Sequence, residues 1–115
     1  MKVVEKPWGR EEMLEVNNNY MVKRLFMKAG NRCSLQYHER KTETIIVISG
    51  ILIVTTNFSG SDSIWEDIQL MPGEHYTIPA GRTHRMYGIT DTIYLEASTP
   101  EQDDVIRVSD DYGRK

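Results

Sequence analysis

Two stretches of the chain carry the pattern that decides the fold and the chemistry. Residues 30–50 read GNRCSLQYHERKTETIIVISG, and residues 73–84 read GEHYTIPAGRTH. In the first stretch Gln36 and His38 lie two positions apart, so an extended strand points both side chains to the same face. Glu43 follows a short polar turn, and His84 follows the rigid Pro-Ala-Gly turn of the second stretch. Together these side chains form a candidate group of nitrogen and oxygen donors.

The rest of the sequence predicts an all-β fold. It is rich in Ile, Val and Thr, which suit pleated strands, and no long segment shows the apolar period of about 3.6 residues that a helix requires. Short apolar runs alternate with turn residues at a spacing typical of a sandwich or barrel. The expected strands are 20–27, 33–38, 44–49, 51–56, 64–70, 76–78, 84–87, 92–97 and 105–108, with a polar loop at 57–63.

One predicted strand has a polar face that lies either toward solvent or toward a polar cavity. Ser34, Gln36 and His38 alternate with the less polar residues of the segment 33–38. Because the donor group lies on that face, we expect it to line a polar cavity inside the barrel. Trp8 is expected to pack onto the barrel or onto a partner chain, and the polar residues 110–115 are expected to fray.

Length and composition exclude several classes of protein. The chain has 115 residues, and we expect one domain over 1–115. A net charge of -3 disfavours a broad basic surface, so neither nucleic acid nor a membrane is an expected partner. The one cysteine, Cys33, excludes an intrachain disulfide and a multi-cysteine zinc site. The apolar run 45–54 is far shorter than the ~20 residues of a membrane span, and no leader pattern is seen at the N-terminus, so a cytoplasmic location is expected.

The two stretches resemble the two motifs of the cupin superfamily. The first motif is Gly, five residues, His, one, His, three or four, Glu, six, Gly; the second is Gly, five, Pro, one, Gly, two, His. Every spacing is met, although Gln36 stands where most cupins have the first His. The resemblance implies a small jelly-roll β-barrel and one divalent metal ion, held by Gln36, His38, Glu43 and His84.

The donor types support a metal site independently of the resemblance. A mixed nitrogen and oxygen set without thiolates suits zinc as the first choice, with manganese, iron, cobalt or nickel as alternatives. Gln is a weaker, neutral ligand than His, so a looser and more exchangeable site is expected. A cupin that has lost its metal is the other interpretation.

Further segments resemble the C-terminal cupin domain of type II mannose-6-phosphate isomerase/mannose-1-phosphate guanylyltransferase. The likeness covers essentially the whole chain, and that family also uses Gln at the position of Gln36. The segments that carry it are KPWG at 6–9, EE at 11–12, VKR at 22–24, SLQYH at 34–38, IPAG at 78–81, HR at 84–85, DDVIR at 103–107 and DDYGR at 110–114.

This resemblance implies a metal-dependent sugar-phosphate isomerase that converts mannose-6-phosphate to fructose-6-phosphate through a cis-enediol. A metal would act as the Lewis acid that stabilises charge on two substrate oxygens. Arg85 matches the family's His-Arg pair and is expected to contact substrate or its phosphate, although strand alternation points it away from His84. The general base is not assigned, with Glu96 as one possibility.

Lys41 occupies the position of a family Arg and is the second candidate catalytic residue. It keeps the charge but loses the forked geometry that grips phosphate, and Thr44 replaces a family His. Lys23 and Arg24 are further phosphate candidates. These changes leave two alternatives open: an enzyme for another sugar or polyol, and a non-catalytic, metal-binding sugar-recognition module. The expected partners are a small sugar phosphate and a second copy of the chain in a homodimer.

Overall fold

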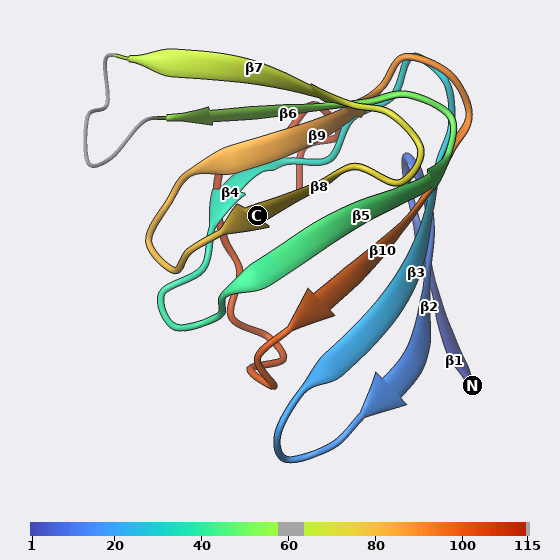
Figure 1. Ribbon diagram of the computed structural model, residues 1–115. Helices are drawn as coiled ribbons and strands as arrows, with labels where there is room; N and C mark the ends of the chain where they lie inside the picture. Colours follow the sequence, from blue (N-terminus) through green and yellow to red (C-terminus); the bar gives the residue numbers. More distant parts are fainter. Residues whose placement is uncertain (58–63, 115) are drawn as a thin grey trace.

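The computed structural model describes residues 1–57 and 64–114, and within these ranges the regular structure is entirely strand (Figure 1). None of the described residues forms a helix with the length and apolarity needed to cross a lipid bilayer. The strands are β1 (Lys2–Lys6), β2 (Gly9–Val16), β3 (Met21–Met27), β4 (Leu35–Tyr37), β5 (Glu43–Ser49), β6 (Leu52–Asn57), β7 (Trp65–Leu70), β8 (His75–Ile78), β9 (His84–Gly88), β10 (Thr92–Ser98) and β11 (Ile106–Ser109).

The strands form two antiparallel sheets that lie face to face (Figure 1). The larger sheet has the order β1-β2-β3-β10-β5-β8, and the smaller has the order β11-β4-β9-β6-β7. Strands that are neighbours in sequence often belong to different sheets, so the chain crosses repeatedly between the two layers. The all-β prediction is confirmed, and each of the nine expected strands begins and ends within two residues of an observed one.

The core lies between the sheets and is made by alternate residues of the central strands. In β5, Ile45 and Val47 are fully buried, whereas Ile46 and Ile48 face outward. In β6, Leu52 and Val54 are buried in the same way. Burying an aliphatic side chain of this size stabilises the fold by about 1.5–3 kcal/mol. These strands are therefore held firmly, and they give the polar side chains at their ends a fixed position.

The strands β1 and β2 were not predicted from the sequence. Their residues are mostly charged, and their burial pattern shows little of the inside-outside alternation that reveals a strand. Charge pairs fasten β2 to β3 instead: Lys23 lies 3.3 Å from Glu11, and Arg24 lies 2.6 Å from Glu12. Between β1 and β2, Trp8 is only 3% exposed and joins the core, which confirms that it packs onto the barrel.

One turn position, residue 50, requires glycine for two reasons. Gly50 connects β5 to β6 with a φ of 87°, and a Cβ atom there would overlap the main-chain oxygen of Asp91. Only glycine meets both conditions without strain. The predicted polar loop at 57–63 lies outside the described residues except for Asn57, which ends β6.

Candidate metal centre

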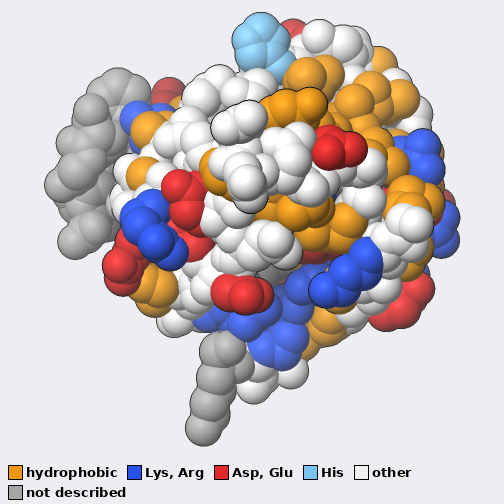
Figure 2. Space-filling view, turned by 90° about the horizontal axis from the view of Figure 1, so that it is seen from below, with side chains coloured by type: hydrophobic (Ala, Val, Ile, Leu, Met, Phe, Trp, Pro, Cys, Tyr) orange, Lys and Arg blue, Asp and Glu red, His pale blue; other side chains and the backbone are white. Residues whose placement is uncertain are grey.

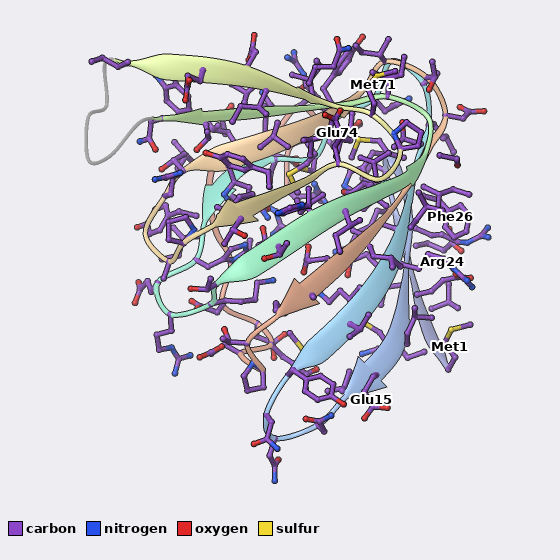
Figure 3. All side chains as sticks on the ribbon, in the orientation of Figure 1. Met1, Glu15, Arg24, Phe26, Met71 and Glu74 are labelled. Atoms are coloured by element: carbon purple, nitrogen blue, oxygen red, sulfur yellow. The ribbon has the colours of Figure 1, made fainter. Side chains whose placement is uncertain are left out.

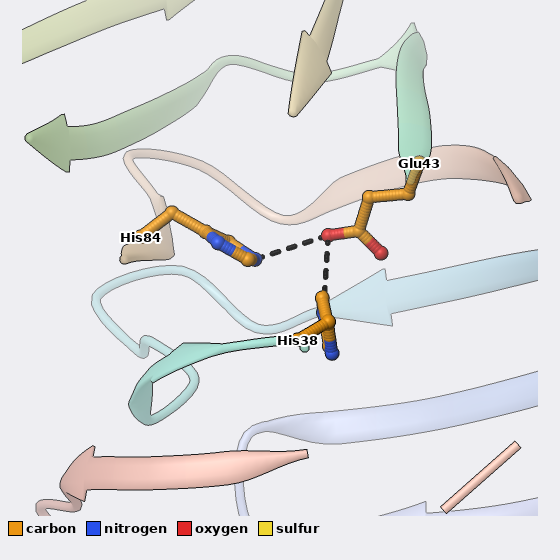
Figure 4. Close-up of side chains that lie close together, drawn as sticks. All are labelled: His38, Glu43 and His84. Carbon is orange, nitrogen blue, oxygen red and sulfur yellow. Dashed lines mark ion pairs between the residues drawn. The ribbon is translucent and has the colours of Figure 1, made fainter. Parts of the chain in front are cut away.

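The residues singled out by the two sequence stretches come from both sheets. Gln36 lies on β4 and pairs in register with His84, the first residue of β9. His38 follows β4 directly, and Glu43 is the first residue of β5 in the opposite sheet. Because the sheets face each other, these strand ends bring His38, Glu43 and His84 together between the layers (Figure 4).

The three side chains converge on one point. Glu43 Oε1 lies 3.0 Å from His84 Nε2 and 3.6 Å from His38 Nε2. The two imidazole rings are tilted, with their centroids 5.3 Å apart. All three residues are at most 2% exposed, so water reaches none of them freely. This is a compact, buried donor group.

The other ring nitrogen of each histidine is held by a main-chain carbonyl. His38 Nδ1 lies 2.6 Å from the oxygen of Asp104, and His84 Nδ1 lies 2.9 Å from the oxygen of Arg82. A carbonyl oxygen only accepts hydrogen bonds, so Nδ1 must be the donor in both rings. The Nε2 lone pair of each histidine is thereby directed toward Glu43, the arrangement usual for histidines that bind a metal.

This arrangement fits a metal ion. Neither Nε2 atom nor either carboxylate oxygen of Glu43 makes a hydrogen bond of good geometry within the described residues, although all four are buried. Burial raises the pKa of Glu43, but its contacts with His38 and His84 and the positive charge of Lys41 place that pKa well below its usual value. An ionised carboxylate therefore faces two lone pairs, and a bound cation would satisfy all three donors.

Gln36 lines the same space. Its Oε1 accepts a hydrogen bond of 2.6 Å from Ser34 Oγ, which is completely buried. The polar face predicted for this strand thus lies inside the barrel, as expected. Both Gln36 and His38 line a cavity of about 60 Å³ between the sheets.

Lys41 is the second predicted site residue that the fold brings to this cavity. Its Nζ lies 3.4 Å from Glu43 Oε2 and 3.3 Å from Glu96 Oε2. Burial lowers the pKa of Lys41, but the charges of Glu96 and Glu43 outweigh it and raise the pKa above its usual value. Burial and the charge of Glu43 raise the pKa of Glu96, which the charge of Lys41 only partly offsets. Glu96 is a cavity residue that the sequence suggested only as one possible base.

The structure does not bring Arg85 to this cavity. Its guanidinium donates to the main-chain oxygen of Cys33 from Nε at 3.1 Å and from Nη2 at 3.0 Å, and Nη2 lies 3.3 Å from Asp111 Oδ1. β9 keeps its regular alternation here, so Arg85 and the buried His84 point to opposite faces. Arg85 is not among the residues that line the cavity around His38 and Lys41.

The two phosphate candidates on β3, Lys23 and Arg24, point to opposite faces of the strand because of the same alternation. Lys23 and the buried Leu25 share the inner face, and Lys23 lines the cavity. Arg24 points outward beside Phe26, whose ring lies 5.9 Å from its guanidinium carbon (Figure 3). The alternation around Leu25 is the sequence signal that distinguishes the two.

Three further cations of the cavity wall were not identified from the sequence as site residues. They are Lys6, Arg107 and Arg114, and they come from β1, β11 and the C-terminal segment. A larger cleft of about 420 Å³ shares Lys6, Lys23, Lys41 and Arg107 with the cavity. No local pattern marks these residues, since only the tertiary fold places both ends of the chain beside β3.

The prediction that the C-terminal residues fray is wrong for residues 110–114. Asp111 Oδ2 lies 2.6 Å from Arg32 Nε, and the hydroxyl of Tyr112 donates to Asn31 Oδ1 at 3.2 Å. Arg114 donates to Asp110 from its main-chain nitrogen and its guanidinium. These contacts hold the segment against the barrel, and its Arg114 lines the cavity.

A family profile described as mannose-6-phosphate isomerase C-terminal matches residues 1–110. The chain belongs to this family. The family resemblance inferred from the sequence motifs is therefore confirmed, and it covers almost all of the chain.

The curated relatives that the chain matches are longer proteins. The chain is 33% identical over 117 aligned residues to a mannose-1-phosphate guanylyltransferase of Escherichia coli K12, and 32% identical to the xanthan biosynthesis protein XanB of Xanthomonas campestris. It is 29% identical to the alginate biosynthesis protein AlgA of Pseudomonas aeruginosa. Each match covers 96% of this chain and 23% of the relative, so the chain spans about a quarter of these proteins.

Solved structures confirm that this family member has a cupin fold. The capsular polysaccharide assembling protein CapF of Staphylococcus aureus superposes with a TM-score of 0.81 at 19% identity, over 94% of this chain and 34% of CapF. An RmlC-like cupin from Shewanella frigidimarina superposes with a TM-score of 0.75 at 18% identity, over 90% and 86% of the two chains. At this level of identity the comparison establishes the fold alone.

Proposed function

We propose that this chain is a metal-dependent sugar-phosphate isomerase that interconverts mannose-6-phosphate and fructose-6-phosphate. The observation that carries the proposal is the convergence of the buried side chains of His38, Glu43 and His84. His38 also lines a cavity whose wall carries Lys and Arg side chains. Membership of the mannose-6-phosphate isomerase C-terminal family supports the choice of reaction. The presence of "mannose-1-phosphate" in the names of relatives supports a mannose phosphate as the substrate.

The metal would be held by His38, Glu43 and His84, with Gln36 as the fourth ligand. This set of two imidazoles, one carboxylate and one amide favours zinc, with manganese, iron, cobalt or nickel as further candidates. When bound, a divalent ion supplies a Lewis acid that stabilises negative charge on the substrate oxygens. The remaining steps fall to the residues of the cavity.

The phosphate of the substrate would be bound by the basic side chains of the cavity wall. Lys6 and Lys23 face this space from β1 and β3, and Arg107 and Arg114 face it from the C-terminal side. Arg offers a planar fork of donors that matches a phosphate, and Lys offers a compact charge. We assign Arg85 no contact with the substrate, because it does not line this cavity.

Proton transfer between the two neighbouring carbons needs a group that is not a metal ligand. Glu96 lies in the cavity wall beside Lys41, with 3.3 Å between Oε2 and Nζ. We assign Glu96 the role of moving the proton and Lys41 the role of orienting Glu96. Thr44, the other departure from the family pattern, bonds the hydroxyl of Thr77 at 2.8 Å outside the cavity.

The test is a coupled assay for conversion of mannose-6-phosphate to fructose-6-phosphate. Protein stripped with a chelator is expected to be inactive and to regain turnover with zinc, manganese, cobalt or iron(II). His84→Ala should lose this activity, whereas His75→Ala, which removes an exposed histidine on β8, should keep it. Metal-loaded protein with no turnover would contradict the isomerase and favour a different sugar or a binding role. Protein that holds none of these ions would contradict the metal centre itself.

We also propose that the chain forms a homodimer through the outer face of the larger sheet. Val22, Phe26, Ile46, Ile48 and Ile93 lie on the outward-facing positions of β3, β5 and β10, and Ile48 is 50% exposed. In the view of Figure 2, patches of hydrophobic side chains lie among polar and main-chain atoms in the upper part, and basic side chains gather below them. An apolar face of this kind is typical of an interface.

Light scattering is expected to give the mass of a dimer for the wild-type protein. Ile48→Glu should give a monomer, because it places a charge in the apolar face. Tyr87→Glu, which alters an exposed residue on the smaller sheet, should leave the dimer intact. A monomeric wild-type protein would contradict this proposal without affecting the metal centre.

A further inference from the structure

A buried aspartate from a distant part of the chain contacts the loop between the metal-ligand candidates. Asp104 lies between β10 and β11, 66 positions from His38, and is only 9% exposed. Its neighbour Asp103 has a φ of 35°, a left-handed conformation that Asp tolerates better than most residues. Both the main chain and the side chain of Asp104 make contacts with the segment 38–41.

The side chain of Asp104 accepts hydrogen bonds from three successive main-chain nitrogens. Oδ1 accepts from Glu39 at 3.1 Å, and Oδ2 accepts from Arg40 at 2.8 Å and from Lys41 at 3.0 Å. Hydrogen bonds to an ionised carboxylate are about twice as strong as those between neutral groups. One carboxylate therefore determines the conformation of the turn that leads from His38 to Lys41.

The main chain of Asp104 contacts the histidine itself. Its carbonyl oxygen lies 2.6 Å from His38 Nδ1, a short contact that fixes both the rotation of the ring and the position of its proton. In this orientation the ring presents Nε2 to Glu43, 3.6 Å from Oε1. The carbonyl and the carboxylate belong to one residue, so the bonds of the carboxylate to the turn also hold the carbonyl in place.

We infer that Asp104 is a positioning residue for the metal centre: it holds His38 in the orientation that binds the ion and holds Lys41 beside Glu43. The inference rests on the metal centre proposed above. Losing the contacts that orient a ligating histidine typically weakens metal binding by about 10–100-fold. Substituting Asp104 keeps its main-chain carbonyl but removes the carboxylate bonds that hold this carbonyl in place. A residue with a purely structural role would instead lower thermal stability and leave the affinity of the folded protein unchanged.

Titration of metal-free protein with Co²⁺, followed by visible absorption, tests this inference without an activity measurement. Asp104→Ala is expected to bind Co²⁺ at least about 10-fold more weakly than wild type, with an altered absorption band because the coordination changes. Asp104→Asn keeps one side-chain oxygen, so its Co²⁺ affinity should lie between those of Asp104→Ala and the wild-type protein. Asp103→Asn removes the same charge from the exposed neighbouring residue, keeps a side chain that tolerates the left-handed backbone, and should bind like wild type.

The outcomes separate this inference from the proposed function. Folded Asp104→Ala protein with wild-type Co²⁺ affinity and absorption would overturn the inference. If Asp104→Ala does not fold, Asp104→Asn decides: a roughly threefold or greater loss of affinity supports the inference, and wild-type affinity overturns it. A wild-type protein that binds no Co²⁺ overturns both the inference and the metal centre. Co²⁺ binding without isomerase turnover contradicts only the proposed reaction.

Discussion

Glu43→Gln is expected to weaken the binding of Co²⁺ and Zn²⁺ by at least about 100-fold. Substituting a residue that only contacts a metal ligand already lowers metal affinity by about 10–100-fold. Glu43→Gln removes the anionic donor of the group His38, Glu43 and His84 itself. Gln has nearly the same shape, so the packing around this buried position is kept. The dissociation constants are measured by titrating metal-free protein in a calorimeter.

The matched control for this experiment is Glu39→Gln. It makes the same chemical change four positions earlier, at an exposed residue. The control should bind metal like the wild-type protein. Equal affinities for Glu43→Gln and Glu39→Gln would remove Glu43 from the ligand set.

Glu96→Gln is expected to lower kcat for mannose-6-phosphate by about 100-fold or more, with metal affinity within about threefold of wild type. A positioned acid or base typically contributes 10²–10⁴-fold to the rate, and an amide cannot perform that role. Gln still offers an oxygen to Lys41 Nζ, which lies 3.3 Å from the present carboxylate. Steady-state kinetics on protein loaded with a saturating metal concentration measure the effect.

Two comparisons make the interpretation specific. Glu66→Gln, at an exposed position on β7, should leave kcat unchanged. A parallel loss of kcat and metal affinity in Glu96→Gln would show that the residue acts through the metal centre and does not transfer a proton. Wild-type kcat in this variant would exclude Glu96 from the reaction.

Most of the barrel follows from local sequence, because a strand buried on one face shows its inward residues at every second position. Ile45 and Val47 on β5 are typical of this signal. β1 and β2 were not predicted, because charge pairs such as Arg24–Glu12 contribute to their attachment. Such pairs leave no apolar alternation in the sequence. The sequence therefore predicts the parts of the fold that hydrophobic burial holds and misses those that electrostatic contacts hold.

The candidate site divides in the same way. His38, Glu43 and His84 were predicted from their spacing in the two sequence motifs, and the structure brings them together from both sheets. Arg85 was assigned to the substrate only by resemblance, and the alternation of β9 that pointed it away from His84 agrees with its contacts in the structure. Arg114 and Asp104 reach the site because β11 pairs with β4. No sequence pattern in β4 or β11 predicts that pairing.

The burial of Trp8 gives the cavity a natural optical signal. The indole is 3% exposed and lines the cavity together with His38 and Lys41, whereas Trp65, the second tryptophan, is 42% exposed. The two side chains differ in the polarity around them, so their emission should be centred at different wavelengths, that of Trp8 further to the blue. A ligand in the cavity should change the surroundings of Trp8. Trp65, the first residue of β7, does not line the cavity, so its surroundings should stay the same. The intrinsic fluorescence of the unmodified chain can thus follow occupancy of the site in real time, with Trp65 as an internal reference.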